Sequence, residues 1–253
     1  MNKQPTTQEQ AVFKLPSPKE LCEAGAHLGH RTSRWHPKME PYIFGSKHGV
    51  HFFDLEKTIK QLSETLNFLN GIISRGGLIL FVGTKPAAKA LVKETAQALN
   101  MPYVNERWLG GTLTNFRTIN KRLKHLEDLE AQQASGAWEK FTKKERLQLQ
   151  RKMAKLQEQL EGIRGLSRLP DAVFVADAKK DILPLREAKI VKAAVVAICD
   201  SNIDPTSADY PICANDDAVT SLKIILDVFK DNLKSVKPIS PTAKDAAGEK
   251  TGE

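Results

Sequence analysis

Two basic stretches contain the residue types best suited to binding phosphate groups. The first runs from Gly29 to Lys38 (GHRTSRWHPK), and the second runs from Asn105 to Asn115 (NERWLGGTLTN). Each combines cations that can neutralise phosphates with an indole that can stack, and the glycines of the second permit close backbone approach. Both could instead be ordinary loops in which Trp35 and Trp108 pack on the domain. The residue types favour RNA contact in the first stretch and leave the two interpretations balanced in the second.

Histidines around the first stretch are the best candidates for metal ligands. His27 and His30 are three residues apart and would face the same side of a helix, with Cys22 before them and His36 after them. No second pair of ligands follows at a spacing typical of zinc sites. The sequence therefore specifies no metal site and leaves His27 and His30 as candidates only.

Three polar segments follow apolar runs that are typical of strands: Gly83-Thr84-Lys85, Asp177 and Asp200-Ser201-Asn202. Open parallel sheets bind ligands at such positions, and a nucleotide-using enzyme would centre on Gly83 to Lys85. This turn lacks the further glycines of the dinucleotide-binding and P-loop motifs, so an ordinary strand-to-helix turn is favoured. Aspartates between 200 and 217 could bind Mg²⁺, but the same residue type is common in turns and caps.

Composition agrees better with a binding protein than with an enzyme. The 253 residues carry a formal net charge of +8, which favours polyanionic partners. Residues 1–165 hold 26 Lys and Arg against 16 Asp and Glu, whereas residues 166–253 hold 12 against 14. No catalytic signature such as Gly-x-Ser-x-Gly or His-Glu-x-x-His occurs. Three unevenly spaced cysteines predict reduced thiols, and the absence of a leader or a long apolar stretch predicts a cytosolic protein without a membrane span.

The elements that must position these residues can be predicted from hydrophobic periodicity. Ser17, Pro18 and Glu20 predict the start of a short helix that continues from Leu21 to Leu28. Further helices are expected at 59–73, 84–99 with Thr84 as the cap, 182–191 and 219–233, the last after a cap region at 215–217. Strands are expected at 51–53, 78–82, 103–104, 172–176, 193–199 and from Ile212. Strands that alternate with helices predict an α/β domain with a parallel sheet.

Residues 116–163 show a different pattern, with no predicted strand. Leu149, Met153, Leu156, Leu160 and Ile163 recur at steps of four and three behind a capping box of Thr142 and Glu145. A matching stripe at 119, 123 and 126 precedes a break at Ser135-Gly136. The economical prediction is an antiparallel helical hairpin inserted into the α/β domain. With 12 Lys and Arg against 7 Asp and Glu over residues 116–165, the hairpin is basic.

Domain boundaries follow from these patterns. We expect an α/β domain made of residues 17–115 and 166–234, interrupted by the hairpin insertion at 116–165. Residues 1–16 lack periodicity and predict a flexible N-terminus. Residues 235–253 are rich in Pro, Ser, Gly and charge, which predicts a disordered tail.

The two basic stretches also resemble a known family. Residues 24–30 (AGAHLGH), 35–39 (WHPKM) and 41–45 (PYIFG) are similar to the opening of bacterial small-subunit ribosomal protein two, and 107–116 (RWLGGTLTNF) resembles its most specific signature. The similarity continues through 169–172, 196–205 and 215–218, so it covers roughly residues 17–233 in the family's order. Departures occur at Pro86-Ala87-Ala88, at Leu28 and at Asp177-Ala178-Lys179, and they affect single RNA contacts rather than membership.

The resemblance implies a flavodoxin-like, Rossmann-like sheet sandwiched by helices, with a protruding coiled-coil hairpin. It also implies a structural, non-catalytic constituent of the small ribosomal subunit that needs no cofactor and supports translation in the cytoplasm. Its implied partners are 16S rRNA, bound between head and body, and neighbouring small-subunit proteins, including the large messenger-recruiting protein numbered first.

On this basis we expect cations of the loops and of the hairpin to neutralise rRNA phosphates, while Trp35 and Trp108 mainly fix the shape of their loops. The expected RNA-binding residues are Arg31, Arg34, Trp35, Lys38, Lys47, Arg107, Trp108, Arg117, Lys121 and Arg122. Two alternatives remain at this point: a nucleotide-using α/β enzyme centred on Gly83 to Lys85, and a protein-interaction scaffold that uses the hairpin without RNA.

Overall fold

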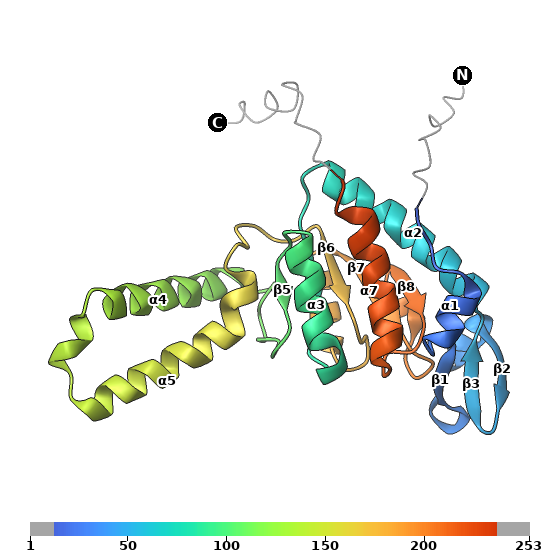
Figure 1. Cartoon of the computed structure of the whole chain (residues 1–253), viewed down its shortest axis with the longest axis horizontal. Coiled ribbons are helices and arrows are strands. Elements are labelled where there is room, and N and C mark those ends of the chain that lie inside the picture. Colours follow the sequence, from blue (N-terminus) through green and yellow to red (C-terminus); the bar gives the residue numbers. More distant parts are fainter. Residues whose placement is uncertain (1–12, 237–253) are drawn as a thin grey trace, which may run out of the picture.

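The computed structural model describes residues 13–236 of the chain (Figure 1). Its strands are β1 (Leu28–Arg31), β2 (Ile43–Lys47), β3 (Val50–Phe53), β4 (Ile79–Val82), β5 (Tyr103–Val104), β6 (Ala172–Val175), β7 (Ala194–Cys199) and β8 (Tyr210–Cys213). Its α-helices are α1 (Pro18–Glu23), α2 (Leu55–Ser74), α3 (Pro86–Ala98), α4 (Phe116–Ala134), α5 (Lys143–Leu160), α6 (Ile182–Ile190) and α7 (Val219–Leu233). Short 3-10 helices are η1 (Thr32–Arg34), η2 (Pro37–Tyr42), η3 (Ala137–Lys140), η4 (Glu161–Ile163) and η5 (Pro205–Ser207).

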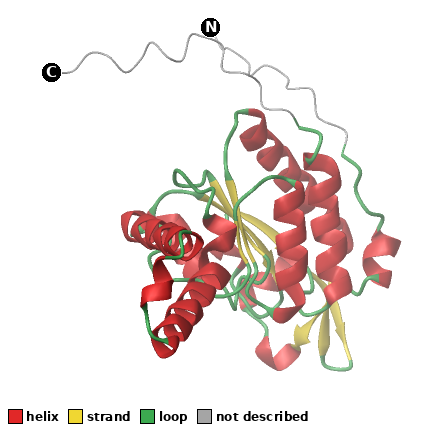
Figure 2. Cartoon of the chain, turned by 60° about the vertical axis from the view of Figure 1, so that its left-hand side comes forward, coloured by secondary structure: helices red, strands yellow, loops and turns green. Residues whose placement is uncertain are grey.

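The central sheet has five parallel strands in the order β5-β4-β6-β7-β8. Because the first strand of this sheet lies second in the row, the chain winds in both directions from β4, as in doubly wound Rossmann-like sheets. Figure 2 shows the sheet between two layers of helices. Helices α2, α3 and α7 pack on one face, and α6 packs on the other. The predicted α/β fold with a parallel sheet is confirmed.

Successive side chains of the central strands point to opposite faces of the sheet, and both faces are covered by helices. In β4, Ile79 and Phe81 pack toward α2, α3 and α7, whereas Leu80 and Val82 pack toward the opposite face. All four residues of β4 are buried, as are all four of β6. A strand covered on both faces needs apolar residues at every position. The prediction of such a strand at 78–82 is therefore confirmed.

A second, antiparallel sheet with the order β1-β3-β2 lies at one end of the molecule. Only its middle strand, β3, was expected from the sequence. The capping box of Ser17 and Glu20 is confirmed, but the helix ends at Glu23, and the predicted continuation to Leu28 is wrong. Gly25 has a φ of +76°, which turns the chain out of the helix and into β1.

Helices α4 and α5 project from the sheet and run side by side (Figure 1). The capping box of Thr142 and Glu145 at the start of α5 is confirmed. The predicted break is also confirmed, since α4 ends at Ala134 and Gly136 has a φ of +72°. Apolar residues of the two helices face each other in one buried cluster: Ile119, Leu123, Leu126, Leu129, Met153 and Leu160.

The first described residues contact α7. The Lys14 N–H donates to Asn232 Oδ1 at 2.8 Å, and the Asn232 side-chain amide donates to the Lys14 carbonyl at 3.0 Å. Phe13 and Leu15 pack against the apolar cluster that includes α7. The rest of the expected flexible N-terminus, residues 1–12, and the expected tail from residue 237 onward lie outside the described residues. Within residues 13–236, no helix combines the length and the apolar character needed to cross a membrane.

Candidate functional site

Three cations of the first basic stretch and its neighbour gather at the end of the antiparallel sheet. Arg31 of β1 and Lys47 of β2 both pair in register with Val50 of the strand between them, so they flank the same position. Arg34 follows in η1, and all three side chains are exposed. Among residues 13–236, none of these three has an ion-pair partner within 4.0 Å, in contrast to Lys38. We call Arg31, Arg34 and Lys47 the sheet-end cations.

The loop that carries Arg34 is held by the turn after β7. The backbone N–H of His30 donates to Ser201 Oγ at 2.8 Å, and the N–H of His36 donates to the Ser201 carbonyl at 2.7 Å. Trp35 is half-buried and lies against His51, with ring centroids 5.1 Å apart. These contacts give Trp35 a role in fixing the loop.

Lys38 differs from the other cations of this stretch because it has an internal partner. Its Nζ lies 2.7 Å from the Asp204 carboxylate and donates to Thr206 Oγ1 at 3.2 Å. The hydrogen bond from Lys38 holds the pKa of Asp204 well below its usual value, with further help from Thr206. Lys38 therefore ties η2 to η5, and sequence reasoning could not detect a partner 166 residues away.

The second basic stretch wraps around one buried carboxylate, Glu187 of α6. Trp108 Nε1 donates to Glu187 at 2.9 Å, and the N–H groups of Gly111 and Leu113 donate at 2.8 and 3.0 Å. Thr114 adds its N–H and hydroxyl, both at 3.3 Å. Burial by itself would raise the pKa of Glu187, but these hydrogen bonds outweigh it and lower the pKa below the usual value. Trp108 therefore points into the domain, and its hydrogen bond to Glu187 helps to fix the shape of the loop.

The same arrangement leaves Arg107 on the surface, directly before the buried Trp108. Glu187 was missed by sequence analysis, because a Glu in an amphipathic helix looks like a solvated residue. A possible signal was its position between apolar neighbours, Leu185 and Ala188, which are also buried.

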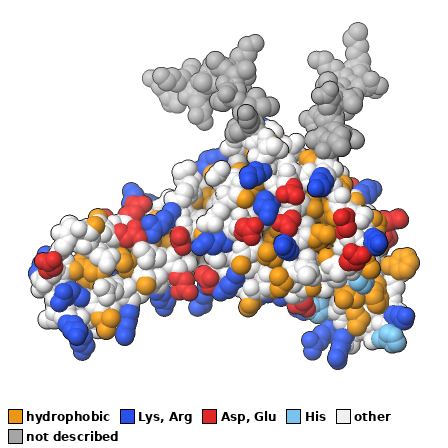
Figure 3. All heavy atoms as spheres, in the orientation of Figure 1, with side chains coloured by type: hydrophobic (Ala, Val, Ile, Leu, Met, Phe, Trp, Pro, Cys, Tyr) orange, Lys and Arg blue, Asp and Glu red, His pale blue; other side chains and the backbone are white. Residues whose placement is uncertain are grey.

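Arg117, Lys121 and Arg122 are all exposed on α4, as expected. Figure 3 shows Lys and Arg side chains along the projecting helices. Within residues 116–165 the structure contains a single ion pair, between Glu130 and Arg164. The other Lys and Arg side chains of this segment have no ion-pair partner within 4.0 Å among the described residues. The structure does not bring these hairpin cations together with the sheet-end cations, which lie at the opposite end of the molecule (Figure 1).

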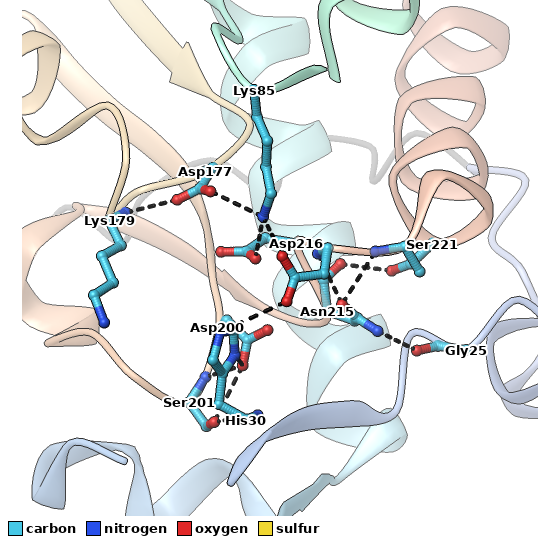
Figure 4. A network of polar contacts seen from close by, with 12 residues as sticks. Gly25, His30, Lys85, Asp177, Lys179, Asp200, Ser201, Asn215, Asp216 and Ser221 are labelled. Carbon is cyan, nitrogen blue, oxygen red and sulfur yellow. Dashed lines mark hydrogen bonds and ion pairs between the residues drawn. The ribbon is translucent and has the colours of Figure 1, made fainter. Parts of the chain in front are cut away.

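The crevice beyond the carboxyl ends of the parallel strands is filled by a polar network (Figure 4). Lys85, at the start of α3, reaches Asp177 at 3.0 Å and Asp216 and Asp217 at 2.7 Å each. Lys85 is half-buried, which would lower its pKa, but the three carboxylates raise it. Burial raises the pKa of Asp216, and the nearby carboxylates of Asp177 and Asp200 add to this effect.

This network opposes the binding of a nucleotide phosphate at Gly83 to Lys85. The predicted cap is wrong: Lys85, without a side-chain cap, occupies the N-cap position of α3, and Thr84 instead donates its N–H and hydroxyl to Asp181 at 3.0 and 2.6 Å. A turn that leads into a helix can bind a phosphate through its free N–H groups. Here the Asp181 carboxylate of the same chain already accepts from the Thr84 N–H. Further carboxylates in the crevice would repel a phosphate.

The metal candidates are separated by the fold. The expected helix between His27 and His30 does not exist, and His27 stacks on Phe52, so the two imidazoles do not form a pair. His30 instead lies 3.0 Å from Asp200 and 3.6 Å from Asp217. One ligand atom from each of these three residues lies within 4.8 Å of the others, and Asp200 Oδ2 is buried without a hydrogen-bond partner. An imidazole and two carboxylates could hold a divalent cation here.

Fold and site together define a class: a doubly wound α/β protein whose crevice lysine is paired with acids and whose loops and helical projection carry exposed cations. Comparison with known proteins narrows this class. Residues 21–235 match the family described as Ribosomal protein S2. The chain therefore belongs to the ribosomal protein S2 family.

Individual relatives agree with this assignment. The small ribosomal subunit protein uS2 of Dehalococcoides mccartyi is 42% identical over 236 residues, which cover 93% of this chain and 96% of the relative. The uS2 proteins of Thermus thermophilus and Tolumonas auensis are 48% and 44% identical over 208 and 223 residues. These alignments cover 82% and 88% of this chain, and 81% and 92% of the relatives.

Proposed function

We propose that this protein is a structural constituent of the small ribosomal subunit that binds 16S rRNA between head and body and supports translation in the cytoplasm. Membership of the ribosomal protein S2 family supports a role in the small ribosomal subunit, and the names of the relatives agree with that role. The protein acts by holding RNA and not by catalysis.

The single observation that carries the RNA-binding part is the contrast between two kinds of charge. The crevice cation, Lys85, is neutralised by three carboxylates. The sheet-end cations and the hairpin cations are exposed and have no such partners among the described residues. Exposed unpaired cations gain free energy when they approach phosphates, because condensed counterions are released. Two separated cationic surfaces suit a large folded RNA whose backbone is recognised by shape.

The expected contact residues take different roles in this proposal. Arg31, Arg34, Lys47, Arg107, Arg117, Lys121 and Arg122 neutralise phosphates. Trp35 and Trp108 fix loop shape, which agrees with the packing of Trp35 on His51 and with the burial of Trp108 against Glu187. Lys38 reaches RNA only in competition with Asp204, so its share of binding is smaller than that of Arg34.

Neighbouring small-subunit proteins, including the large messenger-recruiting protein, are the remaining partners. An apolar hollow on the antiparallel sheet is the surface best suited to a protein neighbour, since Phe44, one of its lining residues, is 83% exposed. We also propose that α4 and α5 pack as a coiled coil, which the four-and-three spacing of their buried residues supports.

The main claim is tested by sedimentation of native extract. The protein should travel with the small subunit on a sucrose gradient at low salt and should be recovered in purified subunits. A companion test uses two double variants. The first combines Arg31→Ala and Arg34→Ala. The control combines Lys60→Ala and Lys223→Ala, because these two lysines are exposed on α2 and α7. The first variant should weaken binding to small-subunit RNA and flatten its salt dependence. Free sedimentation of the wild-type protein would overturn the proposal.

A further inference from the structure

The outer surface of α6 and of the turn before it carries only positive charge. Every exposed polar side chain between 179 and 192 is a cation. The set consists of Lys179, Lys180, Arg186, Lys189 and Lys192. Two exposed apolar residues lie among them, Leu183 at 44% and Ile190 at 70% exposure. We call this set, with Leu183 and Ile190, the α6 surface.

The acids of this segment point inward, so they do not neutralise the α6 surface. Asp181 is 4% exposed and accepts from Thr84, and Glu187 is 4% exposed and accepts from the loop at 108–114. Lys179 donates its backbone N–H to Asp177, but its side chain points away from the Lys85 network (Figure 4). None of the five cations has an ion-pair partner within residues 13–236, and Lys180 and Lys189 bond only to backbone carbonyls.

Helices on the other face of the sheet differ in this respect. Lys230 of α7 is paired with Asp227 and Glu94, and Lys57 of α2 is paired with Asp54. Lys89 of α3 is paired with Glu106. Other lysines of these helices, such as Lys60 and Lys223, are unpaired, but exposed acids such as Glu64 of α2 and Asp231 of α7 lie on the same helices. The α6 surface differs because no exposed acid lies among its cations.

The α6 surface also adjoins a region that we propose to bind RNA. Glu187 joins α6 to the loop that carries Arg107 and leads into α4. A Cβ added to Gly110 of that loop would lie 4.0 Å from Leu183, so the loop and the exposed side of α6 are direct neighbours. The α6 surface therefore lies beside the loop that carries Arg107 and leads into α4.

We infer that the α6 surface is a third RNA-binding surface of this protein, one that contacts phosphates of the small-subunit RNA beside the root of the hairpin. The inference rests on the proposed function. Like-charged side chains at this density repel one another in the free protein, and phosphates relieve that repulsion. Leu183 and Ile190 pack against sugar edges between the phosphate contacts, which is a minor role beside that of the cations.

The test compares two full-length variants that each lose three positive charges. One is Lys179→Gln, Arg186→Gln, Lys189→Gln on the α6 surface. The matched control is Lys60→Gln, Lys223→Gln, Lys234→Gln, because these three lysines are exposed and lie on α2 and α7 or directly after α7. Binding to naked 16S RNA is measured over a range of salt concentrations, and near-ultraviolet circular dichroism verifies folding.

The α6 variant should bind about tenfold or more weakly at moderate salt, with a slope of log affinity against log salt shallower by roughly 2. The control should stay close to wild type. Equal behaviour of the two variants would overturn the inference while leaving the proposed function intact, since the wild-type protein would still bind. Normal binding of the α6 variant to naked RNA, with loss from assembled subunits, would also overturn it, because the surface would then face a protein. Failure of the wild-type protein to bind 16S RNA would instead contradict the proposed function.

Discussion

At the residue scale, Glu187 shows how one buried acid can determine the shape of a surface loop. A carboxylate with two oxygens can accept several hydrogen bonds, and here it accepts from three backbone N–H groups and an indole. The donors of Trp108 and Leu113 are buried and would otherwise lack a partner. Removing the acceptor leaves these donors unsatisfied, and each such donor costs free energy. The effect of a mutation should therefore be larger than that of any single hydrogen bond.

Glu187→Ala should lower the free energy of unfolding by about 3 kcal/mol, and Glu187→Gln by roughly half of that, because an amide keeps one acceptor oxygen. Urea denaturation followed by circular dichroism measures both values. Glu64→Ala serves as the control, since Glu64 is exposed on α2. If Glu187→Ala unfolds at the same urea concentration as the wild type, the carboxylate does not hold the loop.

The same residue predicts a pH dependence. The pKa of Glu187 is lower in the folded state than its ordinary value of 4.5, so the unfolded chain binds a proton more readily. Its contribution is therefore fully present above pH 4.5 and is lost as the pH falls through the lower, folded-state pKa. The difference in unfolding free energy between wild type and Glu187→Gln should shrink between pH 6 and the acid range below pH 4.5. A difference that stays constant over that interval would contradict the assigned protonation.

At the element scale, the accuracy of sequence-based prediction followed the strength of each local pattern. Helices α2, α5 and α7 bury a regular stripe, and β4, β6 and β7 are continuously apolar, so all six were predicted close to their bounds. Strands β1 and β2 (LGHR and IFGSK) have no fully buried residue and were missed. Their stability comes from pairing with β3, which is a tertiary contact that no local pattern encodes.

The candidate site shows the same limit. Exposed cations such as Arg31, Arg107 and Lys121 could be predicted, because a charge in a polar loop or on a polar helix face stays in water. Internal partners could not, since Lys38 meets Asp204 and Lys85 meets Asp216 across more than a hundred residues. The α6 cations were overlooked because the acids between them appear in the sequence to balance their charge.

The attachment of the hairpin to the sheet depends on Gly162 in η4. A Cβ added at this position would overlap the carbonyl oxygen of Tyr103 in β5 and would crowd the Tyr103 ring. Gly162→Ala should therefore force the end of the hairpin away from the sheet and lower the free energy of unfolding by about 3 kcal/mol. Gly165→Ala is the matched control, because nothing lies within 4 Å of its added Cβ. Thermal unfolding of both variants measures the difference, and equal midpoints would show that the root of the hairpin is free to move.

At the scale of the whole molecule, the arrangement separates the charges that stabilise the fold from those that are available to a partner. Lys85 and Lys38 link distant segments of the chain and are paired with three acids and one acid, respectively. The sheet-end cations and the hairpin cations lie at opposite ends of the molecule (Figure 1), so they can contact separate parts of one RNA. Mutations at sites that are far apart and share no partner usually have additive effects on free energy.

This separation predicts additivity in RNA binding. One double variant combines Arg31→Gln and Arg34→Gln, and the other combines Arg117→Gln and Lys121→Gln. Each should make the slope of log affinity against log salt shallower by roughly 1 to 2, depending on how many of the replaced cations contact phosphate. The quadruple variant should lose the sum of the two losses in log affinity, as measured by filter binding to 16S RNA at several salt concentrations. Lys60→Gln with Lys223→Gln provides the control for a general loss of charge. If either double variant alone abolishes the salt dependence, or if the quadruple variant binds no worse than one double variant, the two surfaces do not contact the RNA independently. The polyanion would then be held at one end of the molecule only.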